Sequence, residues 1–260
     1  MLLCVDVGNS NITFGIYKEK ELLYTFRMET KEIKELSLIQ EQFDIVSSTY
    51  GFKLNEIHYV MVDSVVPRLD CLLETFFNEY HLPFTFVNYM SPIGIDIKID
   101  NPSELGSDLL VGAYQACNKY GGPCIVVDMG TANTVILVSE RNEFLGGAIY
   151  PGVLSSFNNL VKDASLLTMA SVKAPSSVIG KSTSECLQSG MLYASSEAVN
   201  GLVKLIEEEC EISNMKVIIT GGIASFLHPY INNSIYDENL LLDGLCNIYI
   251  NFIKKSTLKY

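Results

Sequence analysis

Residues 124–134 read Cys-Ile-Val-Val-Asp-Met-Gly-Thr-Ala-Asn-Thr, an apolar run that ends in an acidic residue, a glycine and hydroxyl or amide side chains. The run predicts a buried strand, and Gly130 gives the chain the freedom for a tight turn directly after it. Turn N–H groups can bind phosphate oxygens, and the Asp128 carboxylate can hold a cation. A single copy is equally consistent with a hairpin whose Asp only accepts backbone N–H bonds.

The same pattern occurs at the N-terminus, where residues 2–11 read Leu-Leu-Cys-Val-Asp-Val-Gly-Asn-Ser-Asn. A single offset of 122 residues aligns three pairs: Asp6 with Asp128, Gly8 with Gly130, and Asn11 with Asn133. A third apolar run, residues 217–220, leads into Gly221-Gly222. This repetition favours nucleotide binding over an isolated hairpin, and it predicts two related halves that share one site.

The rest of the chain alternates strand and helix patterns, which predicts an α/β fold with mixed sheets flanked by helices. Strands are expected at 2–5, 12–17, 22–28, 59–62, 85–87, 124–128, 134–139 and 217–220. Helices are expected at 32–48, 69–80, 101–119, 154–161 and 190–211, and residues 165–180 read as a loop with short elements. Gly121-Gly122-Pro123 breaks the chain between two expected domains, 1–120 and 121–260.

Composition excludes several classes of function. A net charge of −12 with 18 Lys plus Arg argues against binding to nucleic acid or to an anionic membrane surface, because both need clustered positive charge. Seven scattered cysteines without a C-x-x-C pair favour a reducing compartment, so the protein is expected to be cytoplasmic. The three histidines have no metal-site spacing, and no segment sustains about 18 apolar residues, the length of a membrane span.

Six motifs in order give the chain a family resemblance. They are DVGNSN at 6–11, NPSELGSD at 101–108, DMGTANT at 128–134, GGAIYPG at 146–152, GKST at 180–183 and TGG at 220–222. Together they resemble type III pantothenate kinase, of the acetate and sugar kinase, actin-like superfamily. The resemblance implies two related actin-like (ribonuclease H-like) domains and an enzyme that phosphorylates pantothenate with ATP to 4'-phosphopantothenate, the first step of coenzyme A biosynthesis.

The resemblance also implies how ATP and cations bind. The first turn would hold the ATP phosphates and Mg²⁺, with Asp6 as the metal ligand. The residues of this turn are Asp6, Val7, Gly8, Asn9, Ser10, Asn11, Ile12 and Thr13. Thr131 would contact ATP, Gly221 and Gly222 would flank its adenosine end, and Asp128 would help bind a monovalent cation, K⁺ or NH₄⁺.

For the acceptor, the resemblance makes Asp108 the general base that takes the proton from the primary hydroxyl of pantothenate. The substrate would be lined by Gly106, Ser107, Asp108 and Leu109, and by Thr183 from the partner subunit of a homodimer that builds its site at the interface. A solvated helix acid is the alternative reading of Asp108. On the expected helix 101–119, Glu104 shares a face with Asp108 and reads first as a cap and second as another catalytic carboxylate.

The chain departs from the family pattern in the expected acceptor pocket. Residues 106–109 are Gly-Ser-Asp-Leu where the family has Gly-Ala-Asp-Arg, and Ile99 stands where the family tends to have an aromatic residue. Leu109 offers neither the charge nor the hydrogen bond of that Arg. Two alternatives therefore stay open: a kinase of the same superfamily with a different hydroxylated acceptor, and a non-catalytic, nucleotide-binding regulatory paralogue.

Overall fold

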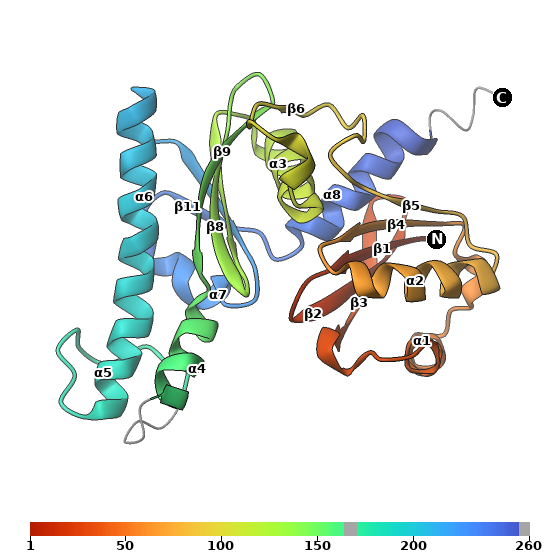
Figure 1. The fold of residues 1–260 in the computed structure, drawn as a ribbon, viewed down its shortest axis with the longest axis horizontal. Coiled ribbons are helices and arrows are strands. Elements are labelled where there is room, and N and C mark those ends of the chain that lie inside the picture. The colour runs from red at the N-terminus through yellow and green to blue at the C-terminus, as the bar shows by residue number, and fades with distance from the viewer. Residues whose placement is uncertain (164–170, 255–260) are drawn as a thin grey trace. The chain divides into compact units, whose positions relative to one another are not determined.

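The computed structural model describes residues 1–163 and 171–254, and these residues form two compact units (Figure 1). Unit 1 comprises Met1–Gln115 and Asn239–Tyr260, and unit 2 comprises Ala116–Glu238. The division differs from the expected one because the chain after Glu238 returns to unit 1. The sequence-derived second domain, 121–260, therefore contains a segment that packs with the first.

The sheet of unit 1 has the strand order β3-β2-β1-β4-β5. Its strands are β1 (Leu2–Val7), β2 (Asn11–Lys18), β3 (Glu21–Glu29), β4 (Tyr59–Ser64) and β5 (Phe84–Phe86). The strands β1, β2 and β3 form the antiparallel meander that the N-terminal sequence predicts, whereas β4 joins β1 in parallel. The central strand β1 therefore has a partner on each side.

Side chains of β1 alternate between two apolar cores, as the twofold period of a strand requires. Leu3, Val5 and Val7 pack with α1 (Leu36–Tyr50) and α2 (Pro67–Glu79). On the other face, Leu2 and Cys4 pack with α8 (Leu240–Ile248) and with the first turns of α3 (Ser107–Tyr120). Because both faces are covered, β1 reads as a nearly continuous apolar run rather than as an alternating one.

The packing of α8 explains why the C-terminal segment belongs to unit 1. Leu242, Leu245 and Cys246 of α8 are buried in the same core as Leu2 and Met61 of the first sheet. The Tyr17 hydroxyl also donates to the Asp243 carboxylate at 2.7 Å. No helix is expected from the sequence at 240–248, so the expected elements give no signal that this segment packs on the first sheet.

Unit 2 repeats the strand arrangement of unit 1. Its order is β11-β10-β7-β8-β9, with β8 antiparallel to β7 and β9, and with β10 parallel to β7 and β11. The strands are β7 (Cys124–Met129), β8 (Ala132–Val138), β9 (Glu143–Pro151), β10 (Lys216–Thr220) and β11 (Ser234–Tyr236). Each strand of unit 2 has a counterpart in unit 1, which confirms the internal duplication.

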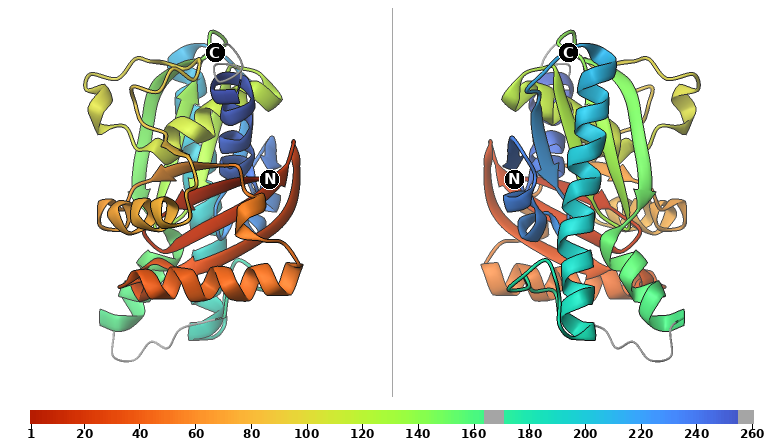
Figure 2. Two further views of the ribbon diagram at one scale, coloured as in Figure 1. Left: turned by 90° about the vertical axis from the view of Figure 1, so that its right-hand side faces the viewer. Right: turned by 90° about the vertical axis from the view of Figure 1, so that its left-hand side faces the viewer.

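One long helix of unit 2 covers a face of its sheet (Figure 2). This helix, α6 (Ser195–Cys210), follows a π-helical turn, Gly190–Ala194, and its Val199 packs with Val127 of β7. The expected helix at 190–211 is thus confirmed. The other helices of unit 2 are α4 (Val153–Asp163), α5 (Thr183–Ser189), α7 (Ala224–Leu227) and the 3-10 turn His228–Tyr230. Part of the expected loop 165–180 lies outside the described residues, and 171–180 holds neither helix nor strand.

The remaining elements of unit 1 are short. They are the 3-10 turns η1 (Thr30–Glu32), η2 (Leu54–Glu56) and η3 (Pro102–Glu104), the strand β6 (Asp96–Ile97) and the π-helical turn η6 (Tyr249–Ile253). Two of them, η1 and η3, turn out to matter for the site.

Two local expectations were wrong. The predicted helix 101–119 is broken, because Asn101 caps η3, Leu105 is extended and α3 starts only at Ser107. Glu104 therefore shares no helix face with Asp108. Its carboxylate accepts a hydrogen bond from the Asn101 side-chain amide at 2.8 Å, so Glu104 contacts the cap residue, but this is not the bond from the Asn101 backbone N–H that a capping box requires.

The 122-residue offset also fails after the turn. Asp6 pairs with Thr13 across the first hairpin, whereas Asp128 pairs with Thr134 across the second, so the second turn is one residue shorter. Asn133 consequently occupies the strand position of Ile12 rather than that of Asn11. Burial agrees with this register, because Asn133 is buried and Asn11 is exposed.

Candidate active site

Two acidic residues end neighbouring parallel strands in unit 1. Asp6 on β1 lies in register with Asp63 on β4, and the next residues, Val7 and Ser64, are also paired. The side chain of Asp63 is fully buried, and that of Asp6 is partly exposed. The carboxyl ends of parallel strands are where α/β proteins bind ligands. This edge of the sheet is therefore a suitable place for a charged ligand.

The predicted phosphate turn follows β1 directly. The Gly8 N–H donates to the Asn11 carbonyl at 3.0 Å, which closes the hairpin, and Asn9, Ser10 and Asn11 are exposed. The Val7 carbonyl accepts a hydrogen bond from the Val65 N–H at 3.1 Å. The bond from Val65 thus fixes the residue before the turn, and the polar residues of the turn remain accessible to a ligand.

Asp108 lies in the first turn of α3, where its Oδ1 accepts a hydrogen bond from the Leu109 N–H at 2.8 Å. A Cβ at Gly106 would collide with this oxygen unless the Asp108 side chain rotated away, so glycine leaves room for the carboxylate in its observed position. Burial raises the pKa of Asp108 above 3.8, and hydrogen bonds from the backbone N–H groups of Leu109 and of Asp108 itself oppose the rise. A raised pKa in a partly buried carboxyl suits a proton acceptor, and it disfavours the reading as a solvated helix acid.

Ser107 connects the start of α3 to the end of β4. Its hydroxyl accepts a hydrogen bond from the Ser64 N–H at 2.9 Å and donates one to the Ser64 carbonyl at 3.0 Å. The side chain is 6% exposed, so these bonds are shielded from water. Ser107 therefore fixes the position of the neighbouring Asp108 relative to the edge of the sheet.

Replacing Ser107 with alanine is expected to lower thermal stability. The Ser64 N–H would lose its buried acceptor, which costs roughly 1–3 kcal/mol. For a chain of this size that corresponds to a fall in melting temperature of about 2–10 °C. Differential scanning calorimetry measures it, with Ser103→Ala as the exposed control, and equal melting temperatures for the two variants would contradict the role given to Ser107.

Unit 2 places Asp128 at the equivalent end of β7. It lies in register with Thr220 of β10, and the backbone then passes through Gly221 at φ +100°. A Cβ at Gly221 would lie 2.5 Å from Asp128 Oδ1 and 2.6 Å from the Met129 N and O atoms. The Asp128 carboxylate and the backbone of Gly221 are thus close together.

The remaining predicted site residues of unit 2 lie in its turns. The Thr131 carbonyl accepts a hydrogen bond from the Gly152 N–H at 3.0 Å, and the Thr131 side chain is exposed. Thr183 is the first residue of α5, directly after the N-cap Ser182, and it is also exposed. Asp6 to Thr13 and Gly106 to Leu109 belong to unit 1, whereas Asp128, Thr131, Thr183 and Gly221-Gly222 belong to unit 2.

Sequence reasoning missed four residues that contact the site elements of unit 1: Thr30, Asp63, Ser64 and Arg68. A signal existed for Asp63, because residues 59–64 read Tyr-Val-Met-Val-Asp-Ser, an apolar run that ends in an acid as at Asp6 and Asp128. Ser64 follows it, and its hydroxyl donates to the Asp70 carboxylate at 2.5 Å. For Thr30 and Arg68 no local pattern gave a signal, because their contacts arise only on folding.

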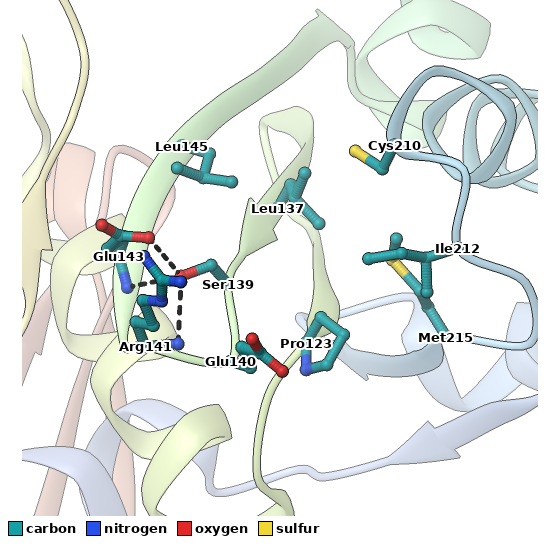
Figure 3. Close-up of a pocket in the computed structure, with 10 residues that line it drawn as sticks. All are labelled: Pro123, Leu137, Ser139, Glu140, Arg141, Glu143, Leu145, Cys210, Ile212 and Met215. Carbon is teal, nitrogen blue, oxygen red and sulfur yellow. Dashed lines mark hydrogen bonds between the residues drawn. The ribbon is translucent and has the colours of Figure 1, made fainter.

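A cavity in unit 2 lies away from these residues. It has a volume of about 270 Å³ and is lined by Leu137, Arg141, Cys210 and Met215, among others (Figure 3). Pro123, which directly precedes the first residue of β7, also lines it. Asp128 stands four residues further along β7 than Cys124, roughly 13 Å at about 3.3 Å per residue. The residues that line the cavity include none of the predicted site residues, so we do not assign it to the reaction.

The described residues hold no ready-made metal cluster and no membrane helix. Within 1–163 and 171–254, no three His, Cys, Asp or Glu side chains gather closely enough to hold a metal ion. Over the same ranges, none of the helices is both long and apolar enough to cross a bilayer.

Residues 2–205 match the family model described as type III pantothenate kinase. The chain is 34% identical over 251 residues to a type III pantothenate kinase from Halalkalibacterium halodurans, an alignment that covers 96% of this chain and 98% of that protein.

Two solved structures are similar in fold. The activator of 2-hydroxyisocaproyl-CoA dehydratase from Clostridium difficile, with bound ADPNP, has a TM-score of 0.54 and 12% identity, covering 100% of this chain and 97% of that one. The ethanolamine utilization protein EutJ from Carboxydothermus hydrogenoformans has a TM-score of 0.55 and 13% identity, covering 95% and 88%. At these identities the likeness concerns the fold alone, which is that of two related actin-like domains.

Proposed function

The chain belongs to the type III pantothenate kinase family and phosphorylates pantothenate with ATP, and we propose that Asp108 is the general base of this reaction. The product, 4'-phosphopantothenate, enters coenzyme A biosynthesis. The observation that carries the proposal is the Asp108 carboxyl itself, partly buried in the first turn of α3 with its pKa raised by burial. Membership of the family makes the chain an enzyme, which disfavours the regulatory alternative.

The proton moves to the Asp108 carboxylate oxygen that does not accept the Leu109 N–H. Asp108 Oδ1 already accepts the Leu109 N–H, so Oδ2 takes the proton from the primary hydroxyl of pantothenate. The hydroxyl oxygen then attacks the γ-phosphorus of ATP. The bond between the γ-phosphorus and the bridging oxygen to the β-phosphate breaks, and ADP leaves. In phosphoryl transfer the protein mainly positions reactants and stabilises charge, so a base of moderate strength is sufficient.

The residues at the end of β1 fit the divalent metal that ATP-dependent kinases use. The Asp6 carboxylate is a hard oxygen ligand, and no cluster of three acids occurs among the described residues. Mg²⁺ in kinases is bound by one or two carboxylates together with substrate phosphates and water. Asp6 would hold the ion on the phosphates, and the bound ion would neutralise charge on the transferring group.

Asp128 is proposed as a ligand of a monovalent cation, K⁺ or NH₄⁺. Its carboxylate lies against the Gly221 backbone and in register with Thr220, so oxygen ligands are available at one place. The proposal is tested by the rate in K⁺, NH₄⁺ and Na⁺ salts at constant ionic strength. Asp128→Asn should abolish any difference between the three, and an unchanged difference would exclude Asp128.

We also propose a homodimer in which Thr183 of one subunit contacts the pantothenate bound by the other. Membership of the family supports this proposal, and Thr183 is exposed at the start of α5, where a second subunit could reach it. Sedimentation equilibrium gives the oligomeric state. Mixing Thr183→Ala with Asp108→Asn would restore part of the activity only if the residues act across subunits.

A coupled assay of ADP release tests the function as a whole. The purified protein is incubated with ATP, Mg²⁺ and K⁺, with and without pantothenate, and 4'-phosphopantothenate is identified by mass spectrometry. Release of ADP that depends on pantothenate is expected. Turnover with another alcohol and none with pantothenate would instead support a different acceptor.

Leu109→Arg should strengthen pantothenate binding. The variant restores the charge that the family pattern has at this position, and a charge-assisted hydrogen bond is worth roughly 1.5–3 kcal/mol. The KM for pantothenate should therefore fall about tenfold or more, with the KM for ATP unchanged. Leu109→Met, which keeps an apolar side chain of similar volume, is the control. An unchanged KM in Leu109→Arg would mean that another group already binds the substrate carboxylate.

A further inference from the structure

Thr30 contacts the phosphate turn twice. Its hydroxyl donates to the Gly8 carbonyl at 2.7 Å, and its N–H donates to the Ser10 carbonyl at 3.0 Å. Thr30 is 2% exposed, so both bonds are made in the protein interior. The only link between Thr30 and the turn along the chain is the long hairpin of β2 and β3. The contact is therefore a tertiary one.

Peptide geometry fixes the direction in which the Asn9 N–H of the turn points. In a trans peptide the C=O of one residue and the N–H of the next point in opposite directions. The single cis peptide among the described residues is Gly122–Pro123, so the Gly8–Asn9 bond is trans. With the Gly8 carbonyl directed at buried Thr30, the Asn9 N–H points away from it, toward the exposed side of the turn.

Arg68 holds Thr30 in place. From the first turn of α2, its guanidinium donates to the Thr30 carbonyl at 2.6 Å and to the Ile33 carbonyl at 2.9 Å. The rigid fork of the guanidinium can bind two carbonyls at a fixed separation, which a lysine cannot do. Hydrogen bonds thus connect α2 to Thr30 of η1, and Thr30 to the phosphate turn.

We propose that Thr30 is a positioning residue for ATP, which sets the orientation of the Gly8–Asn9 peptide so that the Asn9 N–H meets a phosphate oxygen, and that Arg68 supports it. The proposal rests on the proposed role of the Asp6–Thr13 turn in binding ATP phosphates. Backbone N–H groups contribute to catalysis only when they are already oriented toward the position of the charge. A turn with a freely rotating peptide would have to be ordered by the ligand instead.

Steady-state kinetics of Thr30→Val and Thr30→Ser test the proposal. Valine has the shape of threonine but no hydroxyl, so kcat/KM for ATP should fall about tenfold to a hundredfold, while the KM for pantothenate stays within twofold. Serine keeps the hydroxyl and should restore most of the loss. Arg68→Lys should lower kcat/KM for ATP by a smaller factor.

Two further variants separate the possible outcomes. Ile39→Val removes one methylene from the buried face of α1 and lowers stability without contacting the turn. If Thr30→Val lowers kcat/KM for ATP no more than Ile39→Val does, Thr30 has only a structural role and the proposal is wrong. Asp6→Asn tests the turn itself. If Asp6→Asn reduces the rate and Thr30→Val does not, the turn binds ATP without help from Thr30, and the positioning role is wrong. If Asp6→Asn leaves the rate unchanged, the turn is not part of the ATP site, and the proposed function of the turn is wrong as well.

Discussion

Asp108→Asn should lower kcat by about a hundredfold to ten-thousandfold, the range that general base catalysis contributes. Asparagine has nearly the same shape and can still accept the Leu109 N–H through its amide oxygen, but it cannot take a proton from the hydroxyl. The KM for ATP should change little. Asp44→Asn, on the exposed side of α1, is the control for loss of one negative charge. A kcat within threefold of that control would show that Asp108 is not the base.

The same variant should not be less stable than the parent. Burial raises the folded-state pKa of Asp108 above 3.8, so the folded state holds this proton more tightly than the unfolded chain does. Ionisation of Asp108 therefore lowers the free energy of unfolding as pH rises through the ordinary and then the raised pKa. In Asp108→Asn that loss is absent, and the stability gained over the parent should increase with pH across this window and then level off. Urea titrations at pH 4, 5, 6 and 7 would measure it.

Catalysis depends on pH in the opposite sense. The base works only when it is ionised, so kcat/KM should fall as pH is lowered through the raised pKa of Asp108. The acid limb should therefore lie above the pH at which an ordinary aspartate would place it. Activity and stability thus make opposite demands on one carboxyl, as is common at catalytic groups.

The strand ends were predictable because their signals are local. At Asp6 and Asp128 an apolar run, an acid and a glycine occur within seven residues, and this pattern is enough to specify a buried strand and its turn. The repeated topology followed from the repeat in sequence. An ungapped comparison, however, could not detect that the second turn is one residue shorter, so it assigned Asn133 to the position of Asn11.

A local cap and a tertiary contact account for two features that the sequence pattern did not predict. The Asn101 cap and the Glu104 carboxylate close a separate 3-10 turn, so a pattern that reads as one helix becomes two elements, with Asp108 in the first turn of the second. The bond between Thr30 and Gly8 joins residues 22 positions apart that become neighbours only when the meander folds. Gly8 belongs to the turn motif, but the sequence around Thr30 carries no such pattern, so it gives no signal for this contact.

Gly221→Ala should damage ATP binding strongly. The backbone of Gly221 has φ +100°, which alanine adopts only with strain, and the new Cβ would lie 2.6 Å from the backbone N and O of Met129. Since those atoms belong to β7, relief requires the ends of β7 and β10 to separate, and Asp128 Oδ1, 2.5 Å from the same Cβ, must move as well.

A displacement of about 1 Å can lower a rate about a hundredfold. In Gly221→Ala, kcat/KM for ATP should therefore fall by at least about a hundredfold. The K⁺ concentration needed for half-maximal activity should rise. The melting temperature should fall by several degrees, because strain and collision both act on the folded state. Gly222→Ala is the matched control for stability, since no atom lies within 4 Å of its added Cβ. If Gly221→Ala and Gly222→Ala had the same melting temperature, the turn after β10 would accommodate the new Cβ without a displacement of β7. If its K⁺ dependence were also that of the parent, Asp128 would not be linked to this turn.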